Sequence, residues 1–214
     1  MVIMLNNYYT VKHKAESELI IKKSRFIAHV APVNSVTEIE DFILSIREKH
    51  KEAAHNVYAY LLGDKGLCQK ASDDGEPSGT AGKPILELIK NKALQDVVIV
   101  VTRYFGGKLL GAGGLIRAYG QCASQGIQAA VEVEKILHRH LRIVVDYSQL
   151  GALQRKIESL ELSLEGIDYA DMVTINVLVK FLEAEKLKEM FINMTNGQAI
   201  VEELETKYLD FIRK

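Results

Sequence analysis

The spacing of apolar positions predicts a strand hairpin followed by a helix near the start of the chain. Residues 18–24 and 26–33 are rich in apolar and β-branched residues and are expected to pair as strands. Ser35 and Glu38 then match a capping box, in which the two side chains satisfy backbone N–H groups at a helix start. Behind it, apolar residues within 39–46 recur at i, i+3, i+4 and i+7, which predicts a helix with one buried face.

The middle of the chain is predicted to hold a second hairpin, a long polar loop and a buried strand. Two strands are expected at residues 57–62 and 67–71, and the polar loop covers residues 72–84. A short helix around residues 85–89 precedes Val97–Val101. This last segment is an unbroken apolar run, typical of a strand buried on both faces.

A glycine-rich turn follows the buried strand and leads to a long helix predicted at residues 115–133. Glycine accepts positive φ and lets a ligand approach the backbone, while a helix start offers free N–H groups with a partial positive charge. Arg103 lies just beyond the end of the strand, so its charge is expected to face solvent or a partner. The residues predicted to form this anion-contacting surface are Arg103, Tyr104, Gly106, Gly107, Lys108, Gly113, Gly114 and Arg117.

The pattern changes after residue 135. Strands with period-two alternation and helices with one apolar face follow in the order βαββαβ, which is the ferredoxin-like motif. We therefore predict an α+β protein with domains at residues 1–135 and 136–214 and a boundary within Glu132–Ile136. The elements of the second domain are predicted near residues 141–147, 150–160, 163–167, 173–181, 187–194 and 199–207.

Composition and charge limit the function classes. The net charge of −1 excludes a strongly basic nucleic-acid-binding protein, but residues 1–136 carry 17 Lys and Arg against 15 Asp and Glu, which leaves room for a local basic patch. No apolar run approaches the roughly 20 residues of a membrane span. The N-terminus also lacks the basic and then apolar order of a secretory signal. We expect a cytoplasmic protein without membrane contact.

Several common cofactor and ligand motifs are absent from the sequence. Cys68 and Cys122 match no disulfide or zinc spacing. Residues 82–84 end in proline where a Walker A loop needs Ser or Thr, and residues 111–114 do not open a dinucleotide fingerprint. The chain has no Trp and no aromatic pair of RNA-recognition type on a predicted strand, which disfavours base stacking. Accordingly, neither a cofactor nor a metal site is assigned.

The polar loop offers a second candidate site. Its carboxylates Asp73, Asp74 and Glu76 could hold magnesium or supply an acid/base pair facing the basic turn. The alternative, favoured because spacing alone does not make carboxylates converge, is a solvated loop whose residues suit its turns. The candidates from this region are Ser72, Asp73, Asp74, Glu76 and Thr80, with His55 upstream, for which a structural role is favoured.

Taken together, these segments resemble the IMPACT (YigZ-type) family, in its bacterial two-domain form. The resemblance covers essentially the whole chain, and its motifs are specific. The matching segments are residues 24–28, 55–60, 72–77, 79–82, 97–101, 103–107 and 110–111.

The resemblance implies a first domain with a βαβ fold, like domain four of elongation factor G and one small-subunit ribosomal protein. The second domain would resemble domain five of that factor. Eukaryotic relatives regulate translation through a separate N-terminal domain that is not expected in this chain, so that role is not transferred.

Two main functional hypotheses remain, and the sequence leaves open whether any reaction is catalysed. The favoured one is a non-enzymatic protein that binds RNA or the ribosome and regulates translation. The alternative is an enzyme or metal-dependent binder of a small phosphorylated or carboxylated ligand, held by Asp73, Asp74 and Glu76 opposite Arg103. A protein partner bound through the acidic second domain is a third hypothesis.

Overall fold

The computed structural model describes residues 5–63 and 67–213, which divide into two compact units. The first unit comprises residues 8–134 with those from Asp210 onward. The second comprises residues 135–209 with those just before Tyr8. The predicted α+β class with two domains is confirmed. No helix in the described ranges has the length and apolar composition of a membrane span.

A five-stranded sheet forms the first unit. β3 and β4 both pair with β6 in antiparallel fashion, so they run parallel to each other. The connection between them through α1 (Val36–Lys49) is therefore the expected βαβ unit. In spatial order the strands are β2 (Ala15–Ile21), β3 (Ser24–Pro32), β6 (Val97–Tyr104), β4 (His55–Leu62) and β5 (Cys68–Ser72). The predicted turn between β4 and β5 lies mostly outside the described residues.

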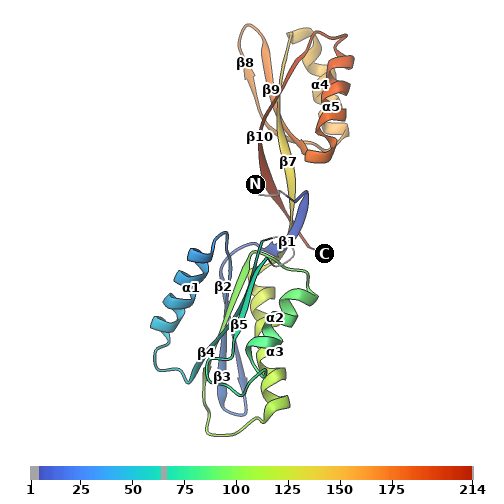
Figure 1. Cartoon of the computed structure of the whole chain (residues 1–214). Helices are drawn as coiled ribbons and strands as arrows, with labels where there is room; N and C mark the ends of the chain where they lie inside the picture. Colours follow the sequence, from blue (N-terminus) through green and yellow to red (C-terminus); the bar gives the residue numbers. More distant parts are fainter. Residues whose placement is uncertain (1–4, 64–66, 214) are drawn as a thin grey trace. The chain divides into compact units, whose positions relative to one another are not determined.

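Helices cover both faces of this sheet (Figure 1). One face is covered by α1, whose first turn is the predicted capping box: the Ser35 hydroxyl accepts the Glu38 N–H at 3.2 Å. The other is covered by α2 (Gly82–Asn91) and α3 (Ala112–Ala130). Because alternate residues of β6 contact these two layers, the apolar part of β6 is fully buried, as its sequence predicted.

The bounds of α3 differ from the predicted residues 115–133. Gly113 and Gly114 lie inside its first turn and do not adopt positive φ, so they are helical residues rather than turn residues. At the other end, Val131 has a φ of 61°, which stops the helix. Periodicity could not locate either end, because small and apolar residues continue through both.

The second unit has the predicted βαββαβ order. Helices α4 and α5 bury their apolar faces against one side of a sheet in which β7 pairs with β9 and β10, and β8 lies beyond β9. β1 (Asn7–Val11) also pairs with β7. The elements are β7 (Glu132–Val145), α4 (Tyr147–Ser159), β8 (Ser163–Tyr169), β9 (Val173–Lys180), a 3-10 turn (Phe181–Glu183), α5 (Ala184–Met194) and β10 (Ile200–Ile212).

The chain passes from the first unit to the second within a strand. β7 is continuous through Glu132–Ile136, the segment predicted as the boundary, and its first residues belong to the first unit. In that unit the backbone N–H of Arg213, just after β10, donates to the Glu132 carbonyl oxygen at 3.0 Å.

Candidate functional site at the end of the central strands

Strand alternation places the predicted site residues on two faces of the first sheet. Arg103 continues the series of β6 side chains that face α2 and α3. Tyr104 faces the opposite side, where its hydroxyl lies 2.9 Å from Nδ1 of His50, the residue that ends α1. The sheet register sets Phe26 and His55 beside Arg103 on the flanking strands. Arg103 and Tyr104, which the sequence grouped together, therefore lie in separate environments.

Arg103 is buried, so the expectation that it faces solvent or a phosphate is wrong. The residue is 5% exposed, and its Nη1 donates to Oε1 of Glu76 at 2.6 Å. Its Nη2 donates to the Ser24 hydroxyl at 3.5 Å. The guanidinium also lies over two aromatic rings, at 5.4 Å from the centroid of Phe26 and 5.6 Å from that of Phe105. The polar loop thus supplies a buried counter-ion that strand periodicity could not reveal.

Glu76 is the acceptor at the centre of this cluster. Its Oε1 also accepts the hydroxyl of Tyr119 at 2.7 Å and lies 3.9 Å from Nε2 of His55. Burial, reinforced by the hydrogen bond to Glu76, raises the pKa of Tyr119, so the phenol stays protonated and remains a donor. The cluster joins the polar loop to β6 and α3. Tyr119 was missed from the sequence, because a tyrosine on the apolar face of a helix is more often a core residue.

Asp73 organises the loop and the start of α2. Its carboxylate accepts backbone N–H groups of Gly79, Ala81 and Gly82 at 2.8, 3.1 and 2.8 Å. Burial opposes ionisation of Asp73, but the three hydrogen bonds outweigh it and lower the pKa of the carboxyl. Since Ala81 and Gly82 begin α2, Asp73 also satisfies N–H groups at a helix end.

Asp74 faces yet another set of partners. One carboxylate oxygen pairs with Nη2 of Arg47 at 2.7 Å, and the other accepts the backbone N–H of Asn56 at 2.7 Å. Its carbonyl oxygen accepts from Nδ1 of His55 at 2.8 Å. The three loop carboxylates therefore do not converge, and the described residues contain no cluster of three His, Cys, Asp or Glu able to hold a metal ion.

The two hydroxyl candidates of the loop make local contacts. The Thr80 hydroxyl donates to the Pro77 carbonyl oxygen at 2.7 Å, and the Ser72 hydroxyl accepts the Asp74 N–H at 3.3 Å. Both contacts stabilise turns. The loop as a whole is not simply solvated, however, because Glu76 is buried within it.

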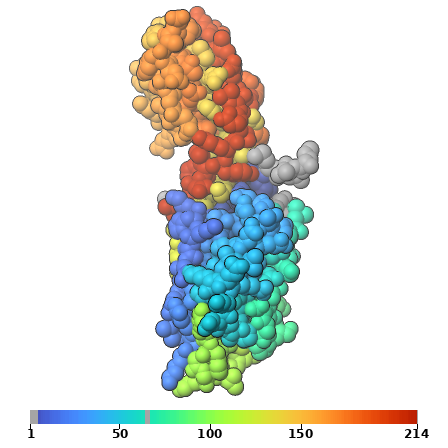
Figure 2. Space-filling view, turned by 90° about the vertical axis from the view of Figure 1, so that its left-hand side faces the viewer, coloured from blue at the N-terminus to red at the C-terminus, as the bar shows by residue number. Residues whose placement is uncertain are grey.

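The exposed members of the predicted surface lie at the end of the sheet where β6 ends, near the Arg103–Glu76 pair. Lys108 is exposed. The backbone of Gly106 lies so close to Lys23 that a Cβ on this glycine would be 2.0 Å from the Lys23 carbonyl carbon. Lys22 and Lys23, at the β2–β3 turn, are exposed too. In Figure 2 the yellow-green surface of the β6–α3 segment accordingly lies beside the blue surface of this turn, and Figure 1 shows both at one end of the unit. These two lysines were not predicted as site residues, although consecutive cations at a hairpin turn were a visible signal.

We call this surface the basic end; it consists of Lys22, Lys23, the loop 105–111, and the first turns of α3 with Arg117. Arg117 is exposed like the three lysines, and none of these four cations has an ion pair within the described part of the chain. The basic end therefore keeps most of the predicted anion-contacting residues, but without Arg103 and Tyr104.

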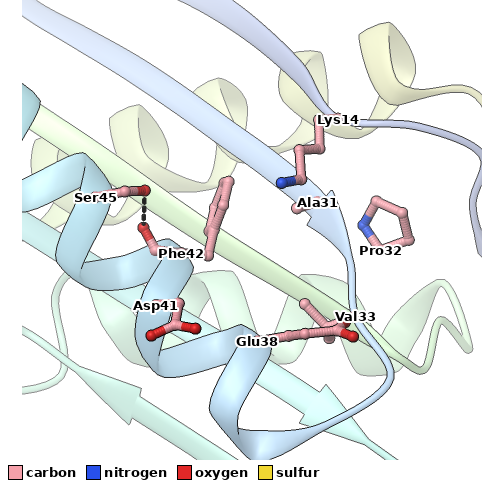
Figure 3. A pocket seen from close by; sticks show the side chains of 8 residues that line it. All are labelled: Lys14, Ala31, Pro32, Val33, Glu38, Asp41, Phe42 and Ser45. Atoms are coloured by element: carbon pink, nitrogen blue, oxygen red, sulfur yellow. Dashed lines mark hydrogen bonds between the residues drawn. The ribbon is translucent and has the colours of Figure 1, made fainter.

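A separate groove of about 370 Å³ lies on the α1 face (Figure 3). Lys14 and Phe42 face each other across it, with the ammonium 5.8 Å from the ring centroid. The Glu38 carboxylate accepts the Asn34 N–H at 2.8 Å, and the Ser45 hydroxyl donates to the Phe42 carbonyl oxygen at 2.7 Å. None of the predicted site residues lines this groove.

Comparisons with known proteins agree with the two-unit architecture. The Impact N-terminal domain matches residues 22–127, and a domain of unknown function, DUF1949, matches residues 143–198. A solved structure, the crystal structure of an hypothetical protein, is 27% identical with a TM-score of 0.60 and covers 94% of this chain and 99% of that one.

Curated relatives match the chain over most of its length. It is 43% identical over 207 residues to the IMPACT family member YvyE of Bacillus subtilis (strain 168), covering 97% of this chain and 95% of that protein. It is 31% identical over 179 residues to the IMPACT family member YigZ of Escherichia coli (strain K12), covering 83% and 88%. The chain therefore belongs to the IMPACT family.

Proposed function

We propose that the first unit binds RNA, free or in the ribosome, through the basic end and thereby regulates translation. The observation that carries this proposal is the contact between Gly106 and the backbone of Lys23, which brings the β2–β3 turn against the β6–α3 loop. Lys22, Lys23 and Lys108 are thereby gathered in one place without ion pairs to described residues. Lysines in such a group bind phosphates by electrostatic attraction and release of counterions.

The backbone of the basic end is also suited to binding the phosphates of RNA. A Cβ added at Gly107 or Gly113 would meet no atom within 4 Å, so a phosphate has room to approach the main chain there. Gly111 is the N-cap residue of helix α3, which has neither a side-chain cap nor an acidic residue in its first turn. Its free N–H groups add partial positive charge. Contacts of this kind position a nucleic acid without reading its sequence.

The fold that the family resemblance implies, with domains like two of elongation factor G, supports a role in translation. Fold alone does not determine function, so the proposal rests chiefly on the charged surface. The enzymatic alternative has less support, since Asp73, Asp74 and Glu76 each bind different protein groups and Arg103 is buried.

Equilibrium binding to ribosomal subunits and to total RNA across a salt series tests the proposal. In the variant with Lys22→Ala, Lys23→Ala and Lys108→Ala, we expect binding to weaken at least about tenfold at low salt. The magnitude of the negative slope of log K against log salt should decrease by about 2, since each contact to a single-strand phosphate contributes about 0.7 to it.

A matched control removes the same charge elsewhere in the first unit. Lys12, Lys51 and Lys90 are also exposed lysines, and their triple alanine variant should bind like the unaltered protein. Equal losses in the two variants would show that only net charge matters, and no binding by the unaltered protein at low salt would refute the proposed function.

A further inference from the structure

Phe105 is an exposed aromatic ring at the basic end. It follows the last residue of β6 and is 52% exposed. The Arg103 guanidinium lies over its ring, 5.6 Å from the centroid. Gly106 and Gly107 come next in the chain, so the two residues that follow have no side chain to cover the ring.

The cation beneath Phe105 is held firmly in place. Arg103 donates to Glu76 at 2.6 Å and to Ser24 at 3.5 Å, and it also lies 5.4 Å from the centroid of the Phe26 ring. Phe105 contacts this buried cation and is half-exposed, so part of its ring remains open to solvent. Such a surface is suited to a flat, electron-rich partner.

The location of the ring indicates which flat partner it meets. Lys108 is three residues further along the loop, within about 10 Å of chain, and the β2–β3 turn abuts Gly106. A ligand that stacks on the ring while its anionic groups reach these lysines is a nucleotide within a single strand. In a duplex the bases are already stacked on one another and are not free to meet the ring.

Although the sequence has no aromatic pair of RNA-recognition type on a predicted strand, we propose that Phe105, in the loop after β6, is a stacking platform for one unpaired RNA base, with the lysines of the basic end binding the flanking phosphates. This inference rests on the proposed function and specifies its ligand as single-stranded or looped RNA. Stacking of a base on an aromatic ring contributes about 1–3 kcal/mol by alanine substitution, which corresponds to about 5- to 150-fold in affinity.

The absence of Trp from the chain provides a direct test. In Phe105→Trp the introduced indole is the sole tryptophan. Adding a 12-nucleotide oligoadenylate should quench its fluorescence, with the dissociation constant found independently from anisotropy of labelled RNA. Unchanged emission at saturating RNA overturns the platform.

Affinity measurements give a second readout. Phe105→Leu should weaken binding of the oligoadenylate by at least fivefold and leave both the salt slope and the affinity for a 12-base-pair RNA duplex unchanged. Leu44→Ala is the matched control, because Leu44 is an apolar residue of α1 outside the basic end and is 56% exposed, yet has no ring; it should bind like the unaltered protein.

The outcomes separate this inference from the proposed function. If Phe105→Leu binds the oligoadenylate normally while the triple-lysine variant binds it weakly, the platform is refuted and the phosphate-binding role is retained. If the unaltered protein binds neither single-stranded nor duplex RNA, the proposed function fails and the platform fails with it.

Discussion

Glu76 and Arg103 form an ion pair of 2.6 Å in which both side chains are almost wholly removed from solvent. The pair attaches the polar loop to the central strand of the first sheet. It also sets the position of the guanidinium on which Phe105 rests. Two residues that the sequence suggested as ligand contacts are thus buried beneath the surface, while the proposed contacts fall to exposed neighbours.

Removal of the Glu76 charge should destabilise the first unit. In Glu76→Gln the buried guanidinium of Arg103 loses its counter-ion, and breaking a buried pair in this way costs about 3 kcal/mol or more. Glu18→Gln is the control, because its pair with Arg25 is exposed and is expected to contribute less than about 1 kcal/mol. Urea unfolding measures both, and equal losses would contradict a structural role for the buried pair.

The two glycines Gly106 and Gly113 should respond to alanine in opposite directions. At Gly106 the new methyl group would overlap the backbone of Lys23, so Gly106→Ala has to displace the β2–β3 turn and is expected to lower the melting temperature strongly. At Gly113 the space is open and the residue is helical, so Gly113→Ala should stabilise by up to about 1 kcal/mol. A similar change in melting temperature in both variants would contradict the close approach of Gly106 to Lys23.

The stability of the first unit should fall as the pH is lowered through the range in which His29 titrates. Burial, only partly offset by Glu16, lowers the pKa of His29 to about 4. The unfolded chain binds a proton there near pH 6.5, so between about pH 6.5 and 4 it binds more protons than the folded protein. Unfolding free energy should therefore decrease by up to about 3 kcal/mol as the pH falls across this range.

Equilibrium unfolding at a series of pH values checks this dependence. His29→Gln should flatten it, whereas His13→Gln, at an exposed position, should leave it intact. If the unfolding free energy depends on pH in the same way in the unaltered protein and both variants, groups other than His29 cause the pH dependence.

Asp73→Asn should loosen the polar loop locally. The substitution weakens acceptance of the Gly79, Ala81 and Gly82 N–H groups, since hydrogen bonds to a charged acceptor are the stronger ones. Hydrogen exchange at these three amides should accelerate by at least about tenfold, while the amides of β6 keep their rates. Faster exchange throughout the unit would indicate global destabilisation instead.

Much of the fold could be predicted from the sequence because its elements have simple periods. Val97–Val101 was correctly identified as a strand buried on both faces, and the second unit follows its alternating pattern. Periodicity assigns a residue to a face of a strand but does not indicate what covers that face. Arg103 was therefore misjudged, since Glu76 arrives from a loop whose path no local pattern determines.

The surface lysines at the β2–β3 turn are a second example of a contact that local sequence patterns do not predict. Lys22 and Lys23 were visible as turn residues, but their approach to Gly106 depends on how β3 pairs with β6. Such proximity between distant segments arises from sheet register, which a single sequence does not specify. The sequence singled out the glycine-rich turn and the polar loop as candidate segments, but it did not predict how these two segments are placed relative to each other.

The continuity of β7 has a practical consequence for dissecting the protein. The first unit takes its last residues from the end of β10, and the second includes residues just before Tyr8, so no single cut separates them. A fragment ending at Glu134 would lose Arg213, whose N–H binds the Glu132 carbonyl oxygen, and would expose a bare strand edge prone to self-association. The two units therefore alternate along the chain, and each is built from stretches that are far apart in the sequence.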